Sequence, residues 1–154
     1  MLEAASWRRV IVGLTVVGCL LGAAGSKPAT GQELPYKVIV HPELTGASIR
    51  RGALSDIFLR KGLRWGDGTS VQPVDQSTQS AVREAFSQHV HGQPVAAVMK
   101  FWMRQISDGR GVPPPVKGSD EEVIAYVASR RGAVGYVSAR APVPGTVRVL
   151  QVVE

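Results

Sequence analysis

The sequence predicts an α/β domain with a largely parallel or mixed sheet. Apolar, strand-like runs at residues 36–41, 71–74, 133–137 and 146–153 alternate with segments that carry a helical apolar period. Such alternation is typical of strands covered by helices in one sheet. The chain has 154 residues, for which one domain is the expectation. About 120 residues are enough to bury a hydrophobic core without disulfides.

The N-terminal segment has the layout of a secretory signal peptide. Arg8 and Arg9 precede an uninterrupted run of apolar or small residues from Val10 to Gly25, and further small residues follow. We therefore assign residues 1–31 to a signal peptide and short linker, and residues 32–154 to the folded domain. The predicted location is outside the cytoplasm, either periplasmic or extracellular.

Cleavage and tethering stay open at this point. Cleavage after Gly25 or after Gly31 fits the pattern, and an uncleaved membrane anchor is a further alternative. Cys19 follows small residues, as in a bacterial lipoprotein, but the residues after it remain apolar where a tether would turn polar. Cys19 is the only cysteine, so the exported part has no disulfide, which suits a bacterial envelope protein.

The first elements of the domain are a strand and a short helix. Residues 36–41 predict a buried strand that ends at Pro42. Residues 54–59 predict a short amphipathic helix with Leu54, Ile57 and Phe58 on its buried face. Gly62 is expected to supply the left-handed cap of this helix. Trp65 is expected to pack in the core.

The central stretch, residues 71–86, combines a strand, a hydroxyl-rich turn and the start of a helix. Val82, Ala85 and Phe86 recur at i, i+3 and i+4 and predict one buried helix face. Free N–H groups at a helix start can bind an anion. The hydroxyl of Ser77, Thr78 or Ser80 could equally satisfy those donors as an ordinary N-cap. The local pattern is consistent with both.

Two more helices and two strands complete the domain. Pro94 opens a helix to about residue 106. Ser119 and Glu122 form a capping-box pattern at the start of the next helix, which ends before Gly132. Residues 133–137 predict a buried strand and residues 146–153 a final strand. The residues expected to be buried in the helix after Pro94 are Val95, Val98, Met99, Trp102 and Ile106.

Charge and motif content argue against several classes of function. The net charge of +6 is scattered and lacks interleaved aromatic residues, so we expect no nucleic-acid binding. His89 and His91 are two residues apart and point to different sides of a helix, which makes a poor metal pair. No nucleophile elbow, phosphate-binding loop or paired-carboxylate pattern is present. We therefore expect no enzyme activity, no metal and no cofactor.

Four segments in order resemble the second lobe of the phosphate-binding proteins of phosphate ABC transporters. That family carries an "IFLGK…W" segment before its ligand loop and a "PGAIGYV" segment near the end of the lobe. The matching segments here are residues 54–61 with Trp65 and Asp67, residues 71–86, residues 122–128 and residues 132–137. The resemblance implies one lobe of a type II periplasmic binding protein-like fold, a mixed sheet flanked by helices.

The resemblance also implies a ligand site in the central turn. The family's ligand loop reads roughly R-x-D-x-S-G-T, and its two charged positions fall near Asp75 and Ser77 here, so both charged ligands are missing. Arg83 lies about one helical turn further on; it could swing in toward a ligand, but we expect a solvated helix residue. The candidate ligand-binding residues are Gln76, Ser77, Thr78, Gln79, Ser80 and Arg83.

The functional prediction is an exported, non-catalytic, solute-binding-like domain that binds phosphate or another small anion weakly. The N-terminal lobe of the family's clamshell, with its own ligand loop, has no counterpart in so short a chain, which removes half of the ligand shell. The alternative is a degenerate lobe that acts as a protein-interaction module in the cell envelope. Expected partners are the anion, an ABC permease or another envelope protein, and a second copy of the chain.

Overall fold

The computed structural model describes residues 34–154. The predicted signal peptide, including Cys19, lies outside the described residues. The elements in chain order are β1 (Tyr36–Val40), β2 (Ser48–Arg50), α1 (Arg51–Phe58), β3 (Gln72–Pro73), β4 (Asp75–Gln76), α2 (Ala81–Phe86), the π-helical turn η1 (Ser87–His91), α3 (Val95–Ser107), β5 (Val116–Lys117), α4 (Asp120–Ala128), β6 (Ala133–Ser138) and β7 (Arg148–Val153).

The main sheet is mixed, as the sequence predicted. Its five strands lie in the order β2-β7-β1-β6-β3. The central strand β1 is antiparallel to both neighbours, β6 and β7, whereas the outer pairs β2–β7 and β3–β6 are parallel. Pro73 cannot donate to a ladder, and it lies in β3 at the edge of the sheet, where proline is tolerated.

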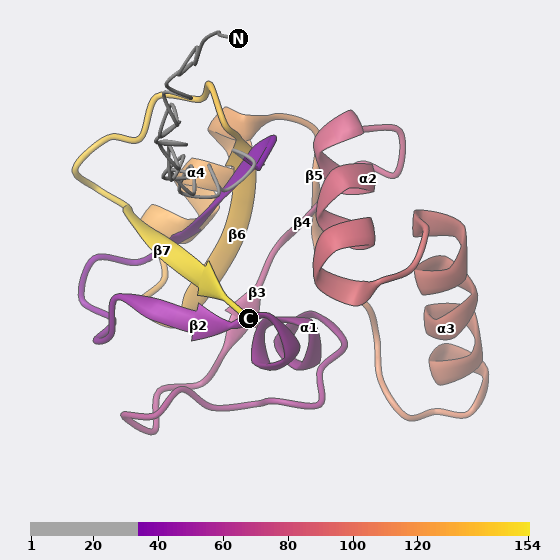
Figure 1. Ribbon diagram of the computed structural model, residues 1–154. Helices are drawn as coiled ribbons and strands as arrows, with labels where there is room; N and C mark the ends of the chain where they lie inside the picture. Colours follow the sequence, from indigo (N-terminus) through magenta and orange to yellow (C-terminus); the bar gives the residue numbers. More distant parts are fainter. Residues whose placement is uncertain (1–33) are drawn as a thin grey trace, which may run out of the picture. The chain divides into compact units, whose positions relative to one another are not determined.

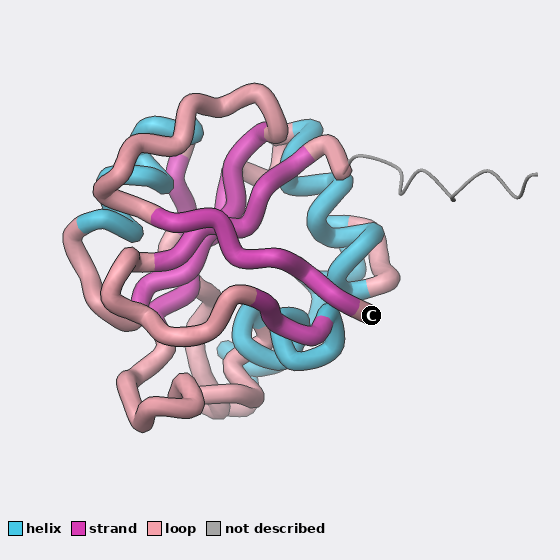
Figure 2. Tube along the Cα trace, turned by 60° about the vertical axis from the view of Figure 1, so that its left-hand side comes forward, coloured by secondary structure: helices cyan, strands magenta, loops and turns pink. Residues whose placement is uncertain are grey.

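Strand alternation divides the core between two faces of the sheet. In β1, Val38 and Val40 pack with α1, α2 and η1, whereas Ile39 packs with α4 on the other face. In β6, Tyr136 lies on the first face and Val137 on the second. The result is a sheet with helices on both sides (Figures 1 and 2).

The predicted central strand is divided between two sheets. β3 joins the main sheet beside β6, and β4 leaves it to form a short parallel pair with β5. Val74 lies between the two strands and is fully buried against α4. Residues 75–80 therefore connect the main sheet to the start of α2.

The predicted helices are present, with two caps that match the sequence analysis. Ser80 caps α2 and Ser119 caps α4, each by accepting a hydrogen bond from the backbone N–H three residues on. Glu122 reaches back to the N–H of Gly118, 2.7 Å away. α2 continues directly into η1, and Gly92 ends that helix in the left-handed conformation.

Two expectations about helices were wrong. The left-handed residue after α1 is Arg60 (φ 55°), not Gly62, because the chain turns two residues earlier than the glycine. In α3, Met99 and Ile106 are exposed (41% and 53%), whereas Val95, Val98 and Trp102 are buried as expected. α3 packs mainly against η1, which lies between α3 and the sheet, so only a narrow stripe of α3 is covered (Figure 1).

Trp65 belongs to the packing of the sheet, as expected. Its indole Nε1 donates to the carbonyl of Gly132 at 2.9 Å, and its ring packs against the core cluster beside α1. Within residues 34–154, no helix has the length and apolar content that crossing a membrane requires.

Candidate functional site

The candidate site is the turn between β4 and α2, which the sequence singled out. Ser80 has an extended backbone (φ −74°, ψ 128°), and its Oγ accepts from the N–H of Arg83 at 3.3 Å. Ser80 is therefore the N-cap, one of the three candidates for that role. Its carbonyl also accepts from the N–H of Glu84 at 3.1 Å, the first bond of the helix.

Gln76 is buried and its amide group is fully engaged. Its Nε2 donates to Oδ1 of Asp120 and to the carbonyl of Tyr136, both at 2.9 Å. Its Oε1 accepts from the hydroxyl of Ser80 at 2.8 Å. Both amide hydrogens of Gln76 are used in hydrogen bonds within the protein. Gln76 therefore stabilises the turn and has no donor left for a ligand.

Arg83 is not a solvated helix residue, and that expectation was wrong. Its side chain is 4% exposed and forms a salt bridge with Asp75. Its Nη1 also donates to the carbonyl of Gln76 at 3.4 Å. Burial lowers the pKa of Arg83, while the nearby Tyr136 raises it. A guanidinium stays charged in a protein interior when it is paired in this way.

The carboxylate of Asp75 accepts hydrogen bonds from three donor groups in different parts of the chain. Arg83, the hydroxyl of Tyr136 and the N–H of Gln76 all donate to its Oδ1. Burial raises the pKa of Tyr136 to about 12, so its hydroxyl remains a donor at neutral pH. The guanidinium that a bound anion would need is thus occupied by the protein's own carboxylate.

Sequence reasoning missed the roles of Asp75 and Tyr136. Asp75 was noted as a turn residue and Tyr136 as a strand residue, and 61 positions separate them. The one local signal was the spacing of eight residues between Asp75 and Arg83, across a turn that brings a strand end and the following helix together.

Ser77, Thr78 and Gln79 form the exposed tip of the turn. Thr78 and Gln79 are exposed and Ser77 is half-buried. The N–H of Ser77 donates to the carbonyl of Lys117 at 3.0 Å, which fixes the tip to β5. The six predicted residues therefore divide: Gln76, Ser80 and Arg83 bond to each other and to the interior, whereas the side chains of the tip face outward.

His89 and His91 form hydrogen bonds with hydroxyl groups. His89 Nδ1 lies 2.6 Å from the hydroxyl of Tyr36, and His91 Nδ1 lies 2.8 Å from the hydroxyl of Ser55. Across residues 34–154, no three His, Cys, Asp or Glu side chains come together as a metal ion would require.

Comparison with solved structures identifies the fold. One neighbour is described as a phosphate ABC transporter substrate-binding protein with bound phosphate, from Clostridium perfringens (TM-score 0.60, 16% identity, 77% of this chain and 44% of that one). Another is an ABC-type phosphate transport receptor from Vibrio cholerae (TM-score 0.58, 16% identity, 77% and 46%). No protein-family model and no curated protein matches the chain.

The chain spans less than half the length of these neighbours. That share is the one expected for a single lobe of a two-lobed binding protein, and it confirms the resemblance at the level of the fold. At 16% identity the likeness carries no residue roles, so the function of the turn has to be argued from its own contacts.

Proposed function

We propose that the chain is an exported, non-catalytic binding lobe that recognises phosphate or a similar small oxyanion weakly. The observation that carries the proposal is the turn at residues 77–82, which the interior holds in a fixed conformation while its tip faces outward. The neighbours are described as phosphate-binding proteins, which supports an oxyanion as the ligand class.

The donors available to an anion are hydroxyls and backbone N–H groups. Ser77 and Thr78 provide hydroxyls, and Ala81 and Val82 lie in the first turn of the helix, where N–H groups have no intrahelical acceptor. α2 and η1 form one continuous helix over residues 81–91, whose dipole adds positive potential at this end. Hydroxyls and first-turn amides are the groups that hold phosphate in many proteins.

The affinity is expected to be low because the charged partner is already used. Arg83 is held by Asp75, so it orders the turn and does not contact the ligand. The remaining donors face water and compete with it for the anion. We therefore expect a dissociation constant of about 1–5 mM, equivalent to about 3–4 kcal/mol of binding free energy.

The experiment is a nuclear magnetic resonance titration of the full chain with phosphate. We expect saturable shifts of the amide signals of residues 77–82. Ala81→Pro removes one donor N–H at the first helical position, which tolerates proline, and Ser80 already has the extended backbone that a following proline requires. This variant should weaken binding, whereas the control Ala81→Gly, which keeps the N–H, should not.

Absence of saturable shifts at these amides up to about 50 mM phosphate would rule out the anion-binding proposal, since that is far above the expected dissociation constant. Arg83→Ala is not a suitable test, because it leaves Asp75 buried without its partner and changes stability as well as any binding.

Export is the second part of the proposal, and it rests on the apolar segment after Arg8 and Arg9. Cell fractionation should place the protein outside the cytoplasm, either free or tethered. Mass spectrometry of the purified protein then distinguishes cleavage after Gly25 or Gly31 from a lipidated Cys19 or an intact N-terminus. Recovery of the intact chain in the cytoplasmic fraction would contradict export.

An interaction module is the alternative, and the surface of α3 favours it. Met99, Met103 and Ile106 recur at i, i+4 and i+7 and are exposed by 41%, 66% and 53%. We propose a second copy of the chain as the partner in this case. Analytical ultracentrifugation should then show a dimer that Met103→Glu dissociates; a monomer at all concentrations would contradict it.

A further inference from the structure

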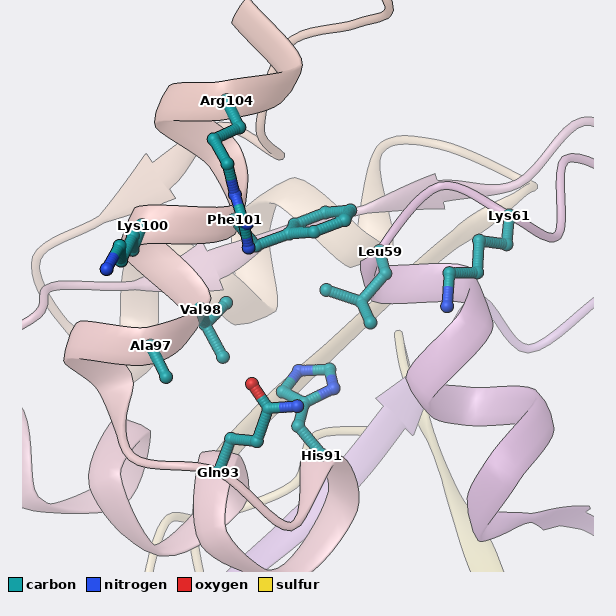
Figure 3. Close-up of a pocket in the computed structure, with 9 residues that line it drawn as sticks. All are labelled: Leu59, Lys61, His91, Gln93, Ala97, Val98, Lys100, Phe101 and Arg104. Atoms are coloured by element: carbon teal, nitrogen blue, oxygen red, sulfur yellow. The ribbon is translucent and has the colours of Figure 1, made fainter.

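A cavity lies at the other end of the α2–η1 helix from the turn at residues 77–82. It has a volume of about 300 Å³ and lies where the ends of α1 and η1 meet the first three turns of α3 (Figure 3). We call it the basic pocket. Its position at the C-terminal end of η1, beside His91, separates it from the N-terminal turn of α2.

One part of the basic pocket is apolar. Phe101 and Val98 come from α3 and Leu59 follows α1; Figure 3 shows the Phe101 ring and Leu59 next to each other above His91. Phe101 is half-buried, and its ring is held edge-on against buried Trp102, with ring centroids 5.2 Å apart. These side chains offer a fixed apolar wall to the non-polar part of a ligand.

The other part of the pocket is basic. Lys61, Lys100 and Arg104 line it, and no lining residue is acidic. Asp56 lies 3.9 Å from Lys61 as an exposed pair, which neutralises little in water. Lys100 and Arg104 form no ion pair with any residue in the range 34–154. The lining side chains therefore give the pocket a net positive charge, which Asp56 and the negative dipole ends of α1 and η1 reduce only in part.

Two polar side chains complete the pocket. Figure 3 shows His91 and Gln93 side by side below Phe101. Burial, with Arg83 and Lys61 nearby, lowers the pKa of His91 to about 4, so the imidazole is uncharged at neutral pH. Recognition of a negative charge then falls to the lysines and Arg104, while His91 and Gln93 can only form neutral hydrogen bonds.

We propose that the basic pocket binds a small organic anion that has an apolar or aromatic body, such as an aromatic carboxylate. The body would lie against Phe101, Leu59 and Val98, and the carboxylate would pair with Arg104, whose guanidinium lies beside Phe101 (Figure 3). Lys61, on the other side of Leu59, would add positive charge. A guanidinium matches the geometry of a carboxylate. Free phosphate fits this site poorly, because the apolar wall would remove water from the anion without replacing its hydrogen bonds.

The test uses the full chain and three probes that separate the two requirements. Benzoate carries both the ring and the charge, benzyl alcohol carries the ring alone, and inorganic phosphate carries the charge alone. We expect benzoate to shift the amide signals of residues 59–61, 91–93 and 97–104. It should bind several-fold more tightly than either comparison probe, a ratio that one ion pair exposed to water accounts for. Benzoate binding should weaken as salt is added.

Matched variants identify the groups. Arg104→Gln should weaken benzoate binding by up to about fivefold, the effect of one ion pair exposed to water. Lys61→Gln should weaken it by a smaller factor. Arg140→Gln removes an exposed positive charge outside the pocket and should leave benzoate binding unchanged. None of the three should alter the phosphate shifts at residues 77–82, so failure at one site is separable from failure at the other.

Four outcomes would overturn the proposal. The first is the absence of a saturable shift by benzoate at the lining residues. The second is benzyl alcohol binding as well as benzoate, which would make the pocket merely apolar. The third is phosphate binding as tightly as benzoate, which would indicate non-specific attraction of any anion. Equal effects of Arg104→Gln and Arg140→Gln on benzoate binding would lead to the same conclusion.

Discussion

Asp75 and Arg83 hold the candidate turn in place through a buried ion pair. Both side chains are less than a tenth exposed, and the hydroxyl of Tyr136 and the N–H of Gln76 bond to the same carboxylate. A buried pair is stable only while both charges and their hydrogen bonds are present. The pair therefore fixes the shape of the turn, and it also explains why the guanidinium of Arg83 is not free to bind an anion at this turn.

Removing either member of this pair should destabilise the protein. We expect Asp75→Asn and Arg83→Met each to lower the free energy of unfolding by about 3–5 kcal/mol, because each leaves an uncompensated buried charge. The double variant should lose less than the sum of the two. Urea unfolding of the four proteins gives the coupling energy. Additive losses, or single losses below about 1 kcal/mol, would mean that the pair is not coupled as its contacts imply.

His91 should make stability depend on pH in a defined window. Its pKa is lowered to about 4 in the folded protein, chiefly by burial, from 6.5 in the unfolded chain. Between these values the unfolded state binds a proton that the folded state does not. The free energy of unfolding is therefore highest above about pH 6.5. It falls by about 2–3 kcal/mol as the pH drops toward 4.

The contribution of His91 is isolated by comparison with His91→Gln. Carboxylates titrate in part of the same window, but they are present in both proteins, so the difference between the two stability profiles reports His91. The variant should lose less stability than the parent protein between pH 6.5 and 4. Parallel profiles would show that His91 is not held uncharged.

At the scale of elements, β6 depends on a close approach of backbone at Gly132, the residue just before the strand begins. A Cβ at Gly132 would lie 1.9 Å from the carbonyl oxygen of Ser70, which is backbone and cannot rotate away. The carbonyl of Gly132 accepts from both Gln72 and the indole of Trp65. Through these two hydrogen bonds, Gly132 links the start of β6 to the edge strand β3 and to the loop that precedes β3.

We expect Gly132→Ala to destabilise the protein by about 1–3 kcal/mol, the usual cost of overpacking. The reason is that the backbone segments around Ser70 and Gly132 must separate. Gly52→Ala is the matched control, since a Cβ there meets nothing within 4 Å and its φ is not positive. Thermal unfolding of both variants measures the difference. Equal midpoints would mean that the approach of Gly132 to Ser70 relaxes at no cost.

The whole molecule is organised around β1 and β6, and stability should decrease away from them. These strands pair along their full length and carry core residues on both faces. α3 buries only Val95, Val98 and Trp102 and packs mainly against η1. None of these three side chains belongs to the two core clusters on the faces of the sheet, so loss of α3 would leave both clusters intact.

Hydrogen exchange should reveal this gradient. We expect the amides of α3 to open with a lower free energy than those of β1 and β6, whose opening requires global unfolding. Native-state exchange at increasing urea concentrations measures both. If α3 exchanged only through global unfolding, with the same opening free energy as β6, the helix would be more tightly coupled to the sheet than its contacts indicate.

The sequence alone determined the local features of this protein. The 3.6-residue apolar period placed the helices, the apolar runs placed β1, β6 and β7, and the hydroxyls of Ser80 and Ser119 marked two helix starts. These features depend on interactions within a few residues, which a linear pattern records. Segments similar to a known family also indicated the fold correctly.

The tertiary structure alone decided what the candidate turn can do. The strand directions around β1, the pairing of Asp75 with Tyr136, and the exposure of Met99 and Ile106 all depend on which elements lie side by side. Periodicity cannot distinguish a buried partner from a solvated one, because burial depends on neighbours far away in the chain. Arg83 therefore reads as a surface residue in the sequence, and only the folded chain makes it the buried partner of Asp75.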